Sequence, residues 1–420
     1  MRLLLISPSE QDIYMKHSAK EARSFWFARL SLTMIAALTP PDVDVSIVDE
    51  NLDDIDFEDN VDLVGITVMT AHAPRAYEIS TRFRARGIKV VLGGIHPSVM
   101  SEEAIQHADA VVIGEAEDVW ASLIEDFKRG GMKRFYKSSK PSDLVDLPIP
   151  RRYLLNKDAY NISSTVQTTR GCPFSCDFCS VTEFFGKRYR QRPIDEVIHE
   201  IEGIDDNFIA FVDDNIIGKP MYAKELFRRL APLKFKWGGQ ASITMTHDLE
   251  LMRLARESGC VGMYVGLESL SIESLAGVGK TFNNVDRYEE VIKRFHDNGI
   301  MVIASIIFGF DSDNEGIFEK TVRFLEKNKV EMATFYILTP LPGTVWANRL
   351  KSENRIISYD WSKYNGGHVL FKPKLMSLET LSEGYRWAYH HFYSIHTFSD
   401  KKAVAPPWQD TPKVPAKLGF

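Results

Sequence analysis

Three of the four cysteines of this 420-residue chain lie within one short run, as Cys172, Cys176 and Cys179 of a C-x-x-x-C-x-x-C pattern. Three thiolates at this spacing can ligate three irons of a [4Fe–4S] cubane, which leaves the fourth iron open to a small ligand. A structural zinc site usually draws four ligands from separated pairs of Cys or His, and the sequence has no second pair. The remaining cysteine, Cys260, precedes an apolar run and indicates a small buried hydrophobe. The pattern therefore predicts an iron–sulfur cluster that carries electrons and binds a ligand.

The motif and its flanks, Thr169-Arg170-Gly171 before it and Phe178 within it, resemble the radical S-adenosylmethionine (SAM) superfamily. The resemblance implies that the open iron chelates the amino and carboxylate groups of SAM. It also implies that electron transfer into the sulfonium releases a 5′-deoxyadenosyl radical. In that family an aromatic ring at the position of Phe178 often lies against the adenine, and a core or shielding role for this ring is an equal alternative.

The composition indicates an ordinary globular chain, with 44% hydrophobic and 26% charged residues. Its net charge of −6 offers no footprint for a polyanion, so nucleic acid is not expected as a partner. The longest apolar stretch, near 301–310, is far shorter than the roughly 20 residues that span a bilayer. Sparse cysteines argue against a disulfide framework. We therefore expect a cytoplasmic protein that is not transmembrane.

Residues 1–130 alternate short apolar runs with helical segments, which predicts a doubly wound, Rossmann-like parallel sheet. Such sheets bind ligands at the carboxyl ends of their strands. The expected strands are Arg2–Ser7, Val43–Val48, Leu63–Val68, Ile88–Leu92 and Ala110–Ile113, and the expected helices are Trp26–Leu38 and Pro74–Arg86.

Two glycine turns follow the last two of these strands, where the backbone can approach a large ligand closely. The arrangement resembles the cobalamin-binding domain upstream of many radical SAM enzymes. The D-x-H-x-x-G motif, which supplies a cobalt-ligating histidine in some cobalamin proteins, is absent, as is the G-x-G-x-x-G dinucleotide fingerprint. A domain without any ligand is the alternative. The resemblance implies that cobalamin lies near the following residues: Thr67, Gly93, Gly94, Ser98, Gly114 and Glu117.

After a polar, proline-containing linker at 131–164, the alternation of strands and helices restarts. Six βα units over 165–344 predict a partial (β/α)6 barrel, whose functional residues should gather at the carboxyl ends of its strands. The expected strands are Thr165–Thr169, Phe208–Val212, Lys236–Ser242, Gly262–Leu267, Val302–Ile307 and Thr334–Leu338. The expected helices are Ile194–Glu202, Ala223–Leu230, Leu249–Ser258, Val285–Asn298 and Ile317–Lys327.

Polar residues and glycines follow four of these strands. Asp213 and Asp214 stand where the resembled family usually has G-G-E, and a carboxylate there can accept hydrogen bonds from the ammonium group of SAM. Ser242 ends the third strand, and Glu268 ends the fourth, where it can accept hydrogen bonds from ribose hydroxyls. Gly309, after the fifth strand, allows adenosine to approach. Each feature alone also fits an ordinary turn or helix cap.

A basic run, Lys187-Arg188-Tyr189-Arg190-Gln191-Arg192, follows the cluster loop. Such a run is usually a solvated face. Because this one follows a site that would hold the carboxylate of SAM, we predict a contact from Arg190.

Residues 345–420 are rich in aromatic side chains and predict a small, mainly helical C-terminal domain with an amphipathic helix over Ser377–Ser394. The aromatics either cap the barrel or line a substrate cavity between the cofactor domains. For the second case, Tyr364, His368 and Tyr385 are polar enough to orient a substrate. We expect the tail from Pro406 to Pro415 to be extended.

The resemblance covers roughly residues 1–395 and implies a cobalamin-dependent radical SAM methyltransferase that acts on an unactivated carbon, or less often on phosphorus. Ring formation, ring contraction or oxidative cyclisation with the same cofactors is the enzymatic alternative. A non-catalytic cobalamin or redox sensor is the alternative of another class. A methylthiotransferase is disfavoured, because residues 1–171 hold no cysteine for a second cluster. The implied partners are a small-molecule, lipid, tetrapyrrole or peptide substrate and an electron donor such as flavodoxin or ferredoxin.

Overall fold

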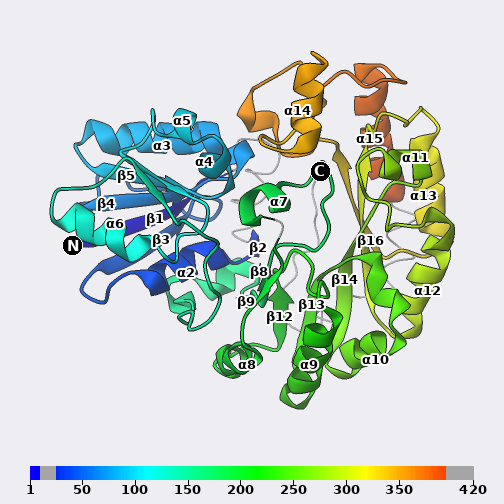
Figure 1. Cartoon of the computed structure of the whole chain (residues 1–420), viewed down its shortest axis with the longest axis horizontal. Coiled ribbons are helices and arrows are strands. Elements are labelled where there is room, and N and C mark those ends of the chain that lie inside the picture. Colours follow the sequence, from blue (N-terminus) through cyan, green and yellow to red (C-terminus); the bar gives the residue numbers. More distant parts are fainter. Residues whose placement is uncertain (10–24, 187, 394–420) are drawn as a thin grey trace.

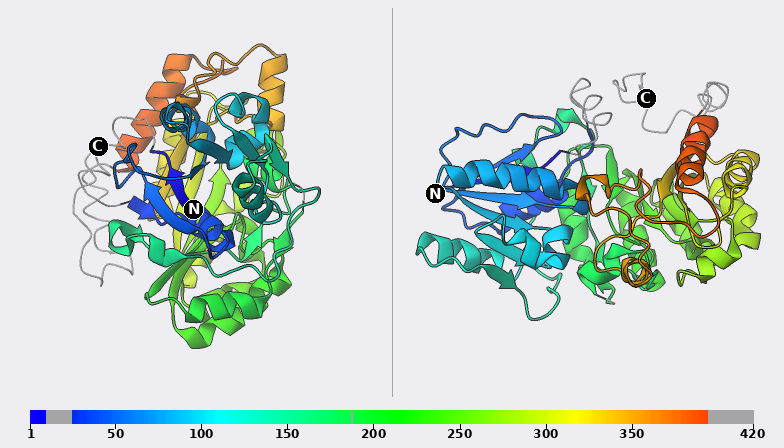
Figure 2. Two further views of the ribbon diagram at one scale, coloured as in Figure 1. Left: turned by 90° about the vertical axis from the view of Figure 1, so that its left-hand side faces the viewer. Right: turned by 90° about the horizontal axis from the view of Figure 1, so that it is seen from above.

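The structure, a computed structural model, describes residues 1–9, 25–186 and 188–393 (Figure 1). Two six-stranded parallel sheets dominate it, one built from the N-terminal residues and one from the central residues. Figure 2 shows that the N-terminal sheet and its helices lie to one side of the central barrel. None of the helices in the described ranges is long and apolar enough to cross a bilayer.

The N-terminal sheet is doubly wound, as predicted. Its strand order places the first strand between the second and third, so a topological switch point lies at their carboxyl ends. Buried residues of α3 (Ala73–Ala85) cover one face, and buried residues of α2 (Leu30–Leu38) and α6 (Trp120–Lys128) cover the other. The strand order is β3 (Asp44–Asp49), β1 (Arg2–Ser7), β4 (Leu63–Thr67), β5 (Lys89–Gly93), β6 (Ala110–Ile113) and β7 (Phe135–Lys137).

Two short strands differ from the expected elements. The helix expected over Trp26–Leu38 begins only at Leu30, because Phe25–Phe27 form strand β2, which pairs with β8 (Tyr160–Ile162). Strand β7 adds an edge to the N-terminal sheet from within the expected linker. Both strands owe their existence to partners distant in sequence, which a local pattern does not reveal.

The central sheet runs in consecutive order, and all of its strands are parallel. This matches the predicted partial barrel. The first expected strand is split, because β10 (Thr169–Arg170) leaves the barrel sheet and pairs antiparallel with β11 (Arg190–Gln191). The strands in order are β9 (Thr165–Val166), β12 (Phe208–Phe211), β13 (Lys236–Ala241), β14 (Cys260–Glu268), β15 (Met301–Phe308) and β16 (Met332–Ile337).

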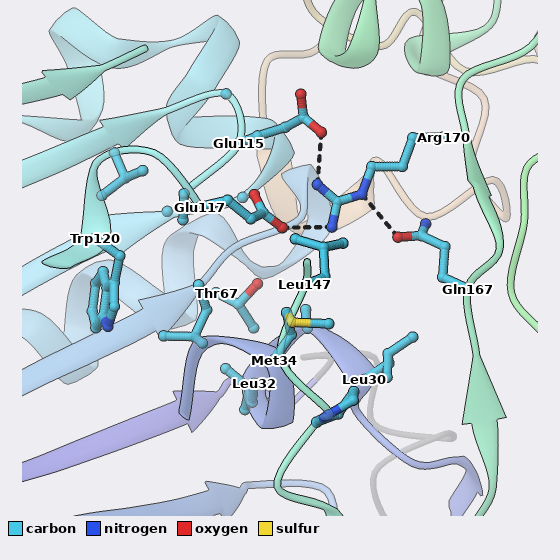
Figure 3. A pocket seen from close by; sticks show the side chains of 18 of the residues that line it. Leu30, Leu32, Met34, Thr67, Glu115, Glu117, Trp120, Leu147, Gln167 and Arg170 are labelled. Carbon is cyan, nitrogen blue, oxygen red and sulfur yellow. Dashed lines mark hydrogen bonds and ion pairs between the residues drawn. The ribbon is translucent and has the colours of Figure 1, made fainter. Parts of the chain in front are cut away.

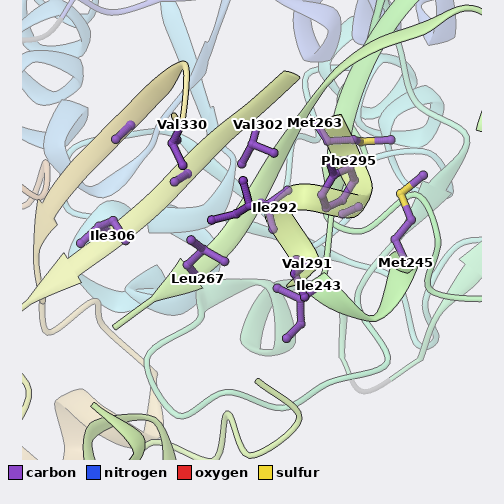
Figure 4. Close-up of a cluster of buried hydrophobic side chains, with 14 of the residues drawn as sticks. Ile243, Met245, Met263, Leu267, Val291, Ile292, Phe295, Val302, Ile306 and Val330 are labelled. Carbon is purple, nitrogen blue, oxygen red and sulfur yellow. The ribbon is translucent and has the colours of Figure 1, made fainter. Parts of the chain in front are cut away.

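Five helices cover the outer face of this sheet: α8 (Ile194–Glu202), α9 (Pro220–Leu230), α10 (Leu249–Glu257), α12 (Tyr288–Asp297) and α13 (Ile317–Lys327). Figure 4 shows part of the core, where Phe295 and Ile292 of α12 pack against apolar side chains of β14 and β15. Cys260 is buried in this core, as predicted, and its Sγ lies 3.8 Å from the carbonyl oxygen of Gly262.

The C-terminal segment is attached to both domains. Helix α15 (Leu378–Phe392) packs on β16, with the ring of Phe335 5.7 Å from that of Phe392. Upstream, Trp361 reaches the N-terminal domain, where its Nε1 donates to Glu103 at 2.9 Å and its ring lies 5.3 Å from that of His96. The predicted tail, Pro406–Pro415, and the last residue of the predicted helix lie outside the described residues.

We predict that Gly384→Ala in α15 destabilises the protein by about 1–2 kcal/mol. A Cβ there would lie 2.2 Å from a ring carbon of Phe318 on α13, and such overpacking costs about 1–3 kcal/mol. The overlap involves three ring carbons within 2.4 Å, which places the cost at about 2–3 kcal/mol, and the gain in helix propensity of about 1 kcal/mol offsets only part of it. Thermal unfolding measures the effect, with the exposed neighbour Glu383→Ala as the control. A midpoint of Gly384→Ala at or above that of the unsubstituted protein would contradict the tight packing of α15 on α13.

Candidate active site

The cluster loop begins at a turn that only glycine tolerates. Gly171 has φ +85°, and a Cβ on it would lie 2.5 Å from the carbonyl oxygen of Arg188. The loop is then fixed from two sides by Asp177, whose N–H donates to Val278 at 3.0 Å and whose carbonyl accepts from the N–H of Trp346 at 2.8 Å. These contacts hold the three-cysteine segment at the carboxyl end of the barrel.

The three cysteines fit a cubane cluster. None is in a disulfide, and a turn of the loop brings two of them together, since the N–H of Cys179 donates to the carbonyl oxygen of Cys176 at 3.0 Å. Burial raises the pKa of Cys172, that of Cys176 to about 11 and that of Cys179 to about 12, so iron must displace their protons. Nowhere in the described ranges do three Cys, His, Asp or Glu side chains converge around a single-ion site.

A buried cation lies beside this loop. Lys280 donates from Nζ to Glu268 Oε1 at 2.6 Å, and Ser305 Oγ donates to Glu268 Oε2 at 3.1 Å. Burial alone would lower the pKa of Lys280, but the charges of Glu268 and Cys176 outweigh it and raise that pKa. The ammonium group can therefore balance the negative charge of a thiolate-ligated cluster. Sequence reasoning missed Lys280, because a lone lysine carries no motif that marks it as part of a site.

Glu268 adopts a backbone conformation with φ +64°, rare for a residue other than glycine, at an irregularity in the pairing of β14 with β15. A Cβ on Gly266 would lie 2.4 Å from Glu268 Oε1 and 2.9 Å from Lys280 Nζ. Glycine at 266 thus makes room for the ion pair. The predicted ribose contact of Glu268 remains a prediction.

The two neighbouring aspartates have different environments. Asp213 is completely buried and accepts hydrogen bonds from the backbone N–H and hydroxyl groups of Thr168 and Thr169. Burial raises the pKa of Asp213 to about 6, although the hydrogen bonds from Thr168 and Thr169 lower it. Asp213 therefore ties β12 to the segment before the cluster loop, and its predicted contact with SAM remains a prediction. Asp214 is half-buried, accepts from Gly171 N–H at 3.1 Å and stays a candidate.

Asn215 contacts the cluster loop and was not predicted. Its Nδ2 lies 3.8 Å from the Sγ of Cys172 and 3.4 Å from the Oγ of Ser242. Its Oδ1 accepts from the backbone N–H of Ser242 at 3.3 Å. Ser242 is thus brought to the site, where it orients the amide that donates to a cluster cysteine.

Three further residues predicted to contact SAM make contacts with other parts of the protein. Gly309 has φ +98°, and a Cβ there would lie 2.9 Å from Leu381 Cδ2, so glycine here makes room for the C-terminal segment, while its predicted contact with adenosine remains a prediction. The ring of Phe178 lies 6.2 Å from that of Phe310, in accord with the shielding alternative. Arg190 donates from Nη1 to the carboxylate of Glu115 at 2.8 Å. That arginine therefore belongs to the junction between the domains.

A cavity of about 320 Å³ opens at the carboxyl end of the N-terminal sheet, between the two domains (Figure 3). Its inner wall is apolar and includes Leu5, Leu32 and Trp120. At Gly65 a Cβ would lie 2.9 Å from Leu5 Cδ2 and 3.5 Å from the ring of Trp120, so a side chain there would crowd the wall. Five of the residues predicted to lie near cobalamin line this cavity: Thr67, Gly93, Gly94, Gly114 and Glu117.

The remaining predicted residue, Ser98, does not line the cavity but shapes it. Its Oγ donates to Gly94 O at 2.7 Å and accepts from Gly114 N–H at 2.8 Å, so it joins the two glycine turns. An apolar cavity beside two turns that expose backbone groups can hold a large ligand that has a flat aromatic group and polar edges. The residues present therefore fit cobalamin.

Arg170, the residue before Gly171, links this cavity to the cluster loop (Figure 3). Its guanidinium donates to Glu115 at 2.6 Å, to Glu117 at 2.5 Å and, from Nε, to Gln167 at 2.9 Å. Arg190 donates to Glu115 as well. The Arg170, Glu115 and Glu117 side chains are each at most 10% exposed, so these charges depend on one another.

The three predicted substrate residues lie outside the cavity. Tyr364 is buried and donates to Ser358 O at 2.8 Å, which gives it a structural role. His368 contacts Asn365 Oδ1 at 3.0 Å, and the ring of Tyr385 packs 6.0 Å from that of Tyr389. A role of His368 and Tyr385 in substrate binding remains a prediction.

Comparison with known proteins assigns these features. A family model described as the radical SAM superfamily matches residues 166–325, and one described as the B12 binding domain matches 27–124. The bacteriochlorophyllide d C-12(1)-methyltransferase of Chlorobaculum tepidum is 34% identical over 91% of this chain and 85% of its own. The bacteriochlorophyllide d C-8(2)-methyltransferase of that organism is 32% identical over 85% of each chain.

Solved structures agree on the fold. The radical SAM methyltransferase TsrM from Kitasatospora setae superposes with a TM-score of 0.67 over 99% of this chain and 92% of its own, at 16% identity. The cobalamin-dependent SAM radical enzyme OxsB superposes with a TM-score of 0.70 over 97% and 69%, at 14% identity.

Fold and site together define an enzyme that pairs a cobalamin domain with a radical SAM barrel. This chain belongs to the radical SAM superfamily, in the branch of cobalamin-dependent methyltransferases. Its cofactors are a [4Fe–4S] cluster, SAM and cobalamin.

We predict that Arg170→Gln greatly reduces cobalamin retention. Removing one partner of a buried ion pair costs about 3–5 kcal/mol, and here Glu117 would lose its cation and Glu115 one of its two. The cobalt-to-iron ratio after anaerobic reconstitution measures the loss. Arg253→Gln breaks an exposed pair with Glu257, so it should leave the ratio unchanged. An unaltered ratio in Arg170→Gln would show that the ion pairs do not support the cavity.

We predict that Asn215→Ala makes the reduction potential of the cluster more negative. Hydrogen bonds to ligating sulfurs stabilise the reduced, more negative cluster, and the variant removes the donor to Cys172. A redox titration followed by electron paramagnetic resonance measures the potential. The matched control is Asn298→Ala, at the residue directly after the outer helix α12, where the amide donates to Arg294 O. Equal potentials for both variants would argue against the contact.

Proposed function

We propose that this methyltransferase acts on an unactivated carbon of a tetrapyrrole of the bacteriochlorophyllide type. The observation that carries the proposal is the direct link, through Arg170, between the cluster loop and a cavity that fits cobalamin. The substrate class rests on the two relatives that are more than 30% identical over most of the chain, both named for bacteriochlorophyllide d. Among the substrate classes open from the sequence, tetrapyrroles thus have the strongest support.

When bound, the cluster and SAM supply a 5′-deoxyadenosyl radical, and cobalamin supplies a methyl group on cobalt. The chain's own residues position these groups. Cys172, Cys176 and Cys179 would ligate the cluster, while Lys280 balances charge beside it and Asn215 donates to Cys172. The glycine turns and apolar wall would hold cobalamin in the cavity that Arg170 also lines.

The electron donor and the compartment also belong to this proposal. A cluster that delivers single electrons needs a low-potential donor, for which we propose a flavodoxin or ferredoxin. Free cysteines that must ligate iron suit a reducing compartment, for which we propose the cytoplasm.

Anaerobic reconstitution with iron, sulfide and hydroxocobalamin, followed by turnover with SAM, a reductant and bacteriochlorophyllide d, tests the proposal. We expect four irons and one cobalt per chain, S-adenosylhomocysteine and 5′-deoxyadenosine as co-products, and a pigment heavier by one methyl group. Mass spectrometry detects all three products.

The triple variant Cys172→Ser, Cys176→Ser, Cys179→Ser is the control and should form neither co-product. If bound cobalamin accompanies 5′-deoxyadenosine alone, a reaction without methyl transfer replaces the proposal. If the protein binds both cofactors without cleaving SAM, a sensing role replaces it.

A further inference from the structure

The inner face of the barrel carries a group of hydroxyls that the cofactor sites do not use. Along β16, Ala333, Phe335 and Ile337 are buried on the helix side, while Thr334 and Tyr336 alternate with them on the inner face and are partly exposed. Tyr264 of β14 lies on the same inner face, since its hydroxyl reaches Thr334. Gln240, its register partner on β13, is exposed, so this face is open to solvent.

Tyr264, Thr334 and Tyr336, hereafter the hydroxyl cluster, form a connected set. Tyr264 Oη lies 2.7 Å from Thr334 Oγ1 and donates to Tyr336 Oη at 3.3 Å. Thr334 must then donate to Tyr264, which leaves the O–H of Tyr336 to donate outside the cluster. Three hydroxyls have three donors, and two internal bonds use only two of them.

The hydroxyl cluster has neighbours on two sides, the ion pair beside the cysteine-containing loop and a loop of the C-terminal segment. Ser305 is the register partner of Thr334 and donates to Glu268, which is paired with Lys280. On the other side, a Cβ at Gly366 would lie 2.7 Å from Tyr336 Cδ1, so a loop of the C-terminal segment packs edge-on against this ring. The hydroxyl cluster thus lies between the ion pair beside the cluster loop and the C-terminal cap.

We propose that the O–H of Tyr336 donates to an oxygen acceptor at the rim of the substrate macrocycle, and that Tyr264 and Thr334 are positioning residues that orient this hydroxyl. This inference rests on the proposed tetrapyrrole substrate. A chlorophyllide carries a carboxylate and a ring carbonyl at its edge, and both accept hydrogen bonds. The O–H of Tyr336 has no acceptor inside the hydroxyl cluster, so it is available to donate to a ligand on this open face.

The test uses Tyr336→Phe and Thr334→Val in the reconstituted enzyme, with bacteriochlorophyllide d as the probe. Fluorescence titration should show binding weakened by roughly threefold to tenfold, the factor for one lost neutral hydrogen bond. Methylated product per 5′-deoxyadenosine should fall by a similar factor, while SAM cleavage without pigment changes less than twofold.

The control is Tyr393→Phe, whose hydroxyl donates to Ala333 O at 2.8 Å from the outer side of the same strand. It should leave binding and coupling unchanged. If the inner variants bind pigment as tightly as this control does, the hydroxyls are structural and the inference falls. If SAM cleavage without pigment drops as much as pigment binding, they serve SAM, and the inference falls as well.

The wild-type protein separates the two proposals. If it binds the pigment but transfers no methyl group, the proposed function fails, and the titration still decides the role of the hydroxyls. If it does not bind the pigment, both the substrate class and the hydroxyl cluster's role are wrong.

Discussion

The buried ion pairs of Arg170 are the interaction on which the arrangement of the two domains depends. The arginine belongs to the barrel and stands two residues before Cys172, while its partners Glu115 and Glu117 follow β6 of the N-terminal domain. Charges this deeply buried are stable only when paired, so the domains cannot separate here without a large cost. One side chain therefore sets the spacing between the cluster loop and the glycine turns that line the cavity.

Other contacts support the same junction from the barrel side. Asp213 fixes Thr168 and Thr169 through their backbone and hydroxyl groups, immediately before Arg170. From the far side, the C-terminal segment packs α15 on the barrel and sends Trp361 to Glu103 of the N-terminal domain. The two domains are thus joined at the floor of the site and again by the C-terminal segment. A radical reaction needs this constraint, because its reacting groups must meet with water excluded.

Much of this fold could be predicted from the sequence, because its helices and strands carry strong local periodicity. Helices α8 and α13 begin and end at the predicted residues, and both sheets have the predicted parallel architecture. The three cysteines were recognisable because a metal cluster constrains spacing within a single loop. What failed depends on distant partners: β2 exists only through β8, and a local pattern made it part of a helix.

The site residues show the same limit more sharply. From spacing alone, Asp213 and Asp214 looked equivalent, and only the fold shows that Thr168 and Thr169 satisfy the first of them. Arg190 follows the cluster loop in sequence, yet Glu115, 75 residues away, takes its charge. Lys280 and Asn215 escaped attention because a lone lysine or asparagine carries no motif. A motif identifies the side chains that bind a cofactor. The charged groups and hydrogen-bond donors that adjust the properties of that cofactor follow other strands, and only the fold brings those strand ends together.

Glu268 shows how these separate observations combine. Its carboxylate accepts from Lys280 on the side of the cluster loop and from Ser305 on the side of the hydroxyl cluster, and glycine at 266 leaves room for it. Its unusual positive φ is maintained at the irregular pairing of β14 with β15, where a regular strand would be more stable. Strained backbone conformations cluster at functional sites, and this one lies where two polar groups meet a carboxylate. The carboxylate of Glu268 is thus the point where the charge balance of the cluster loop and the polar inner face of the barrel are coupled.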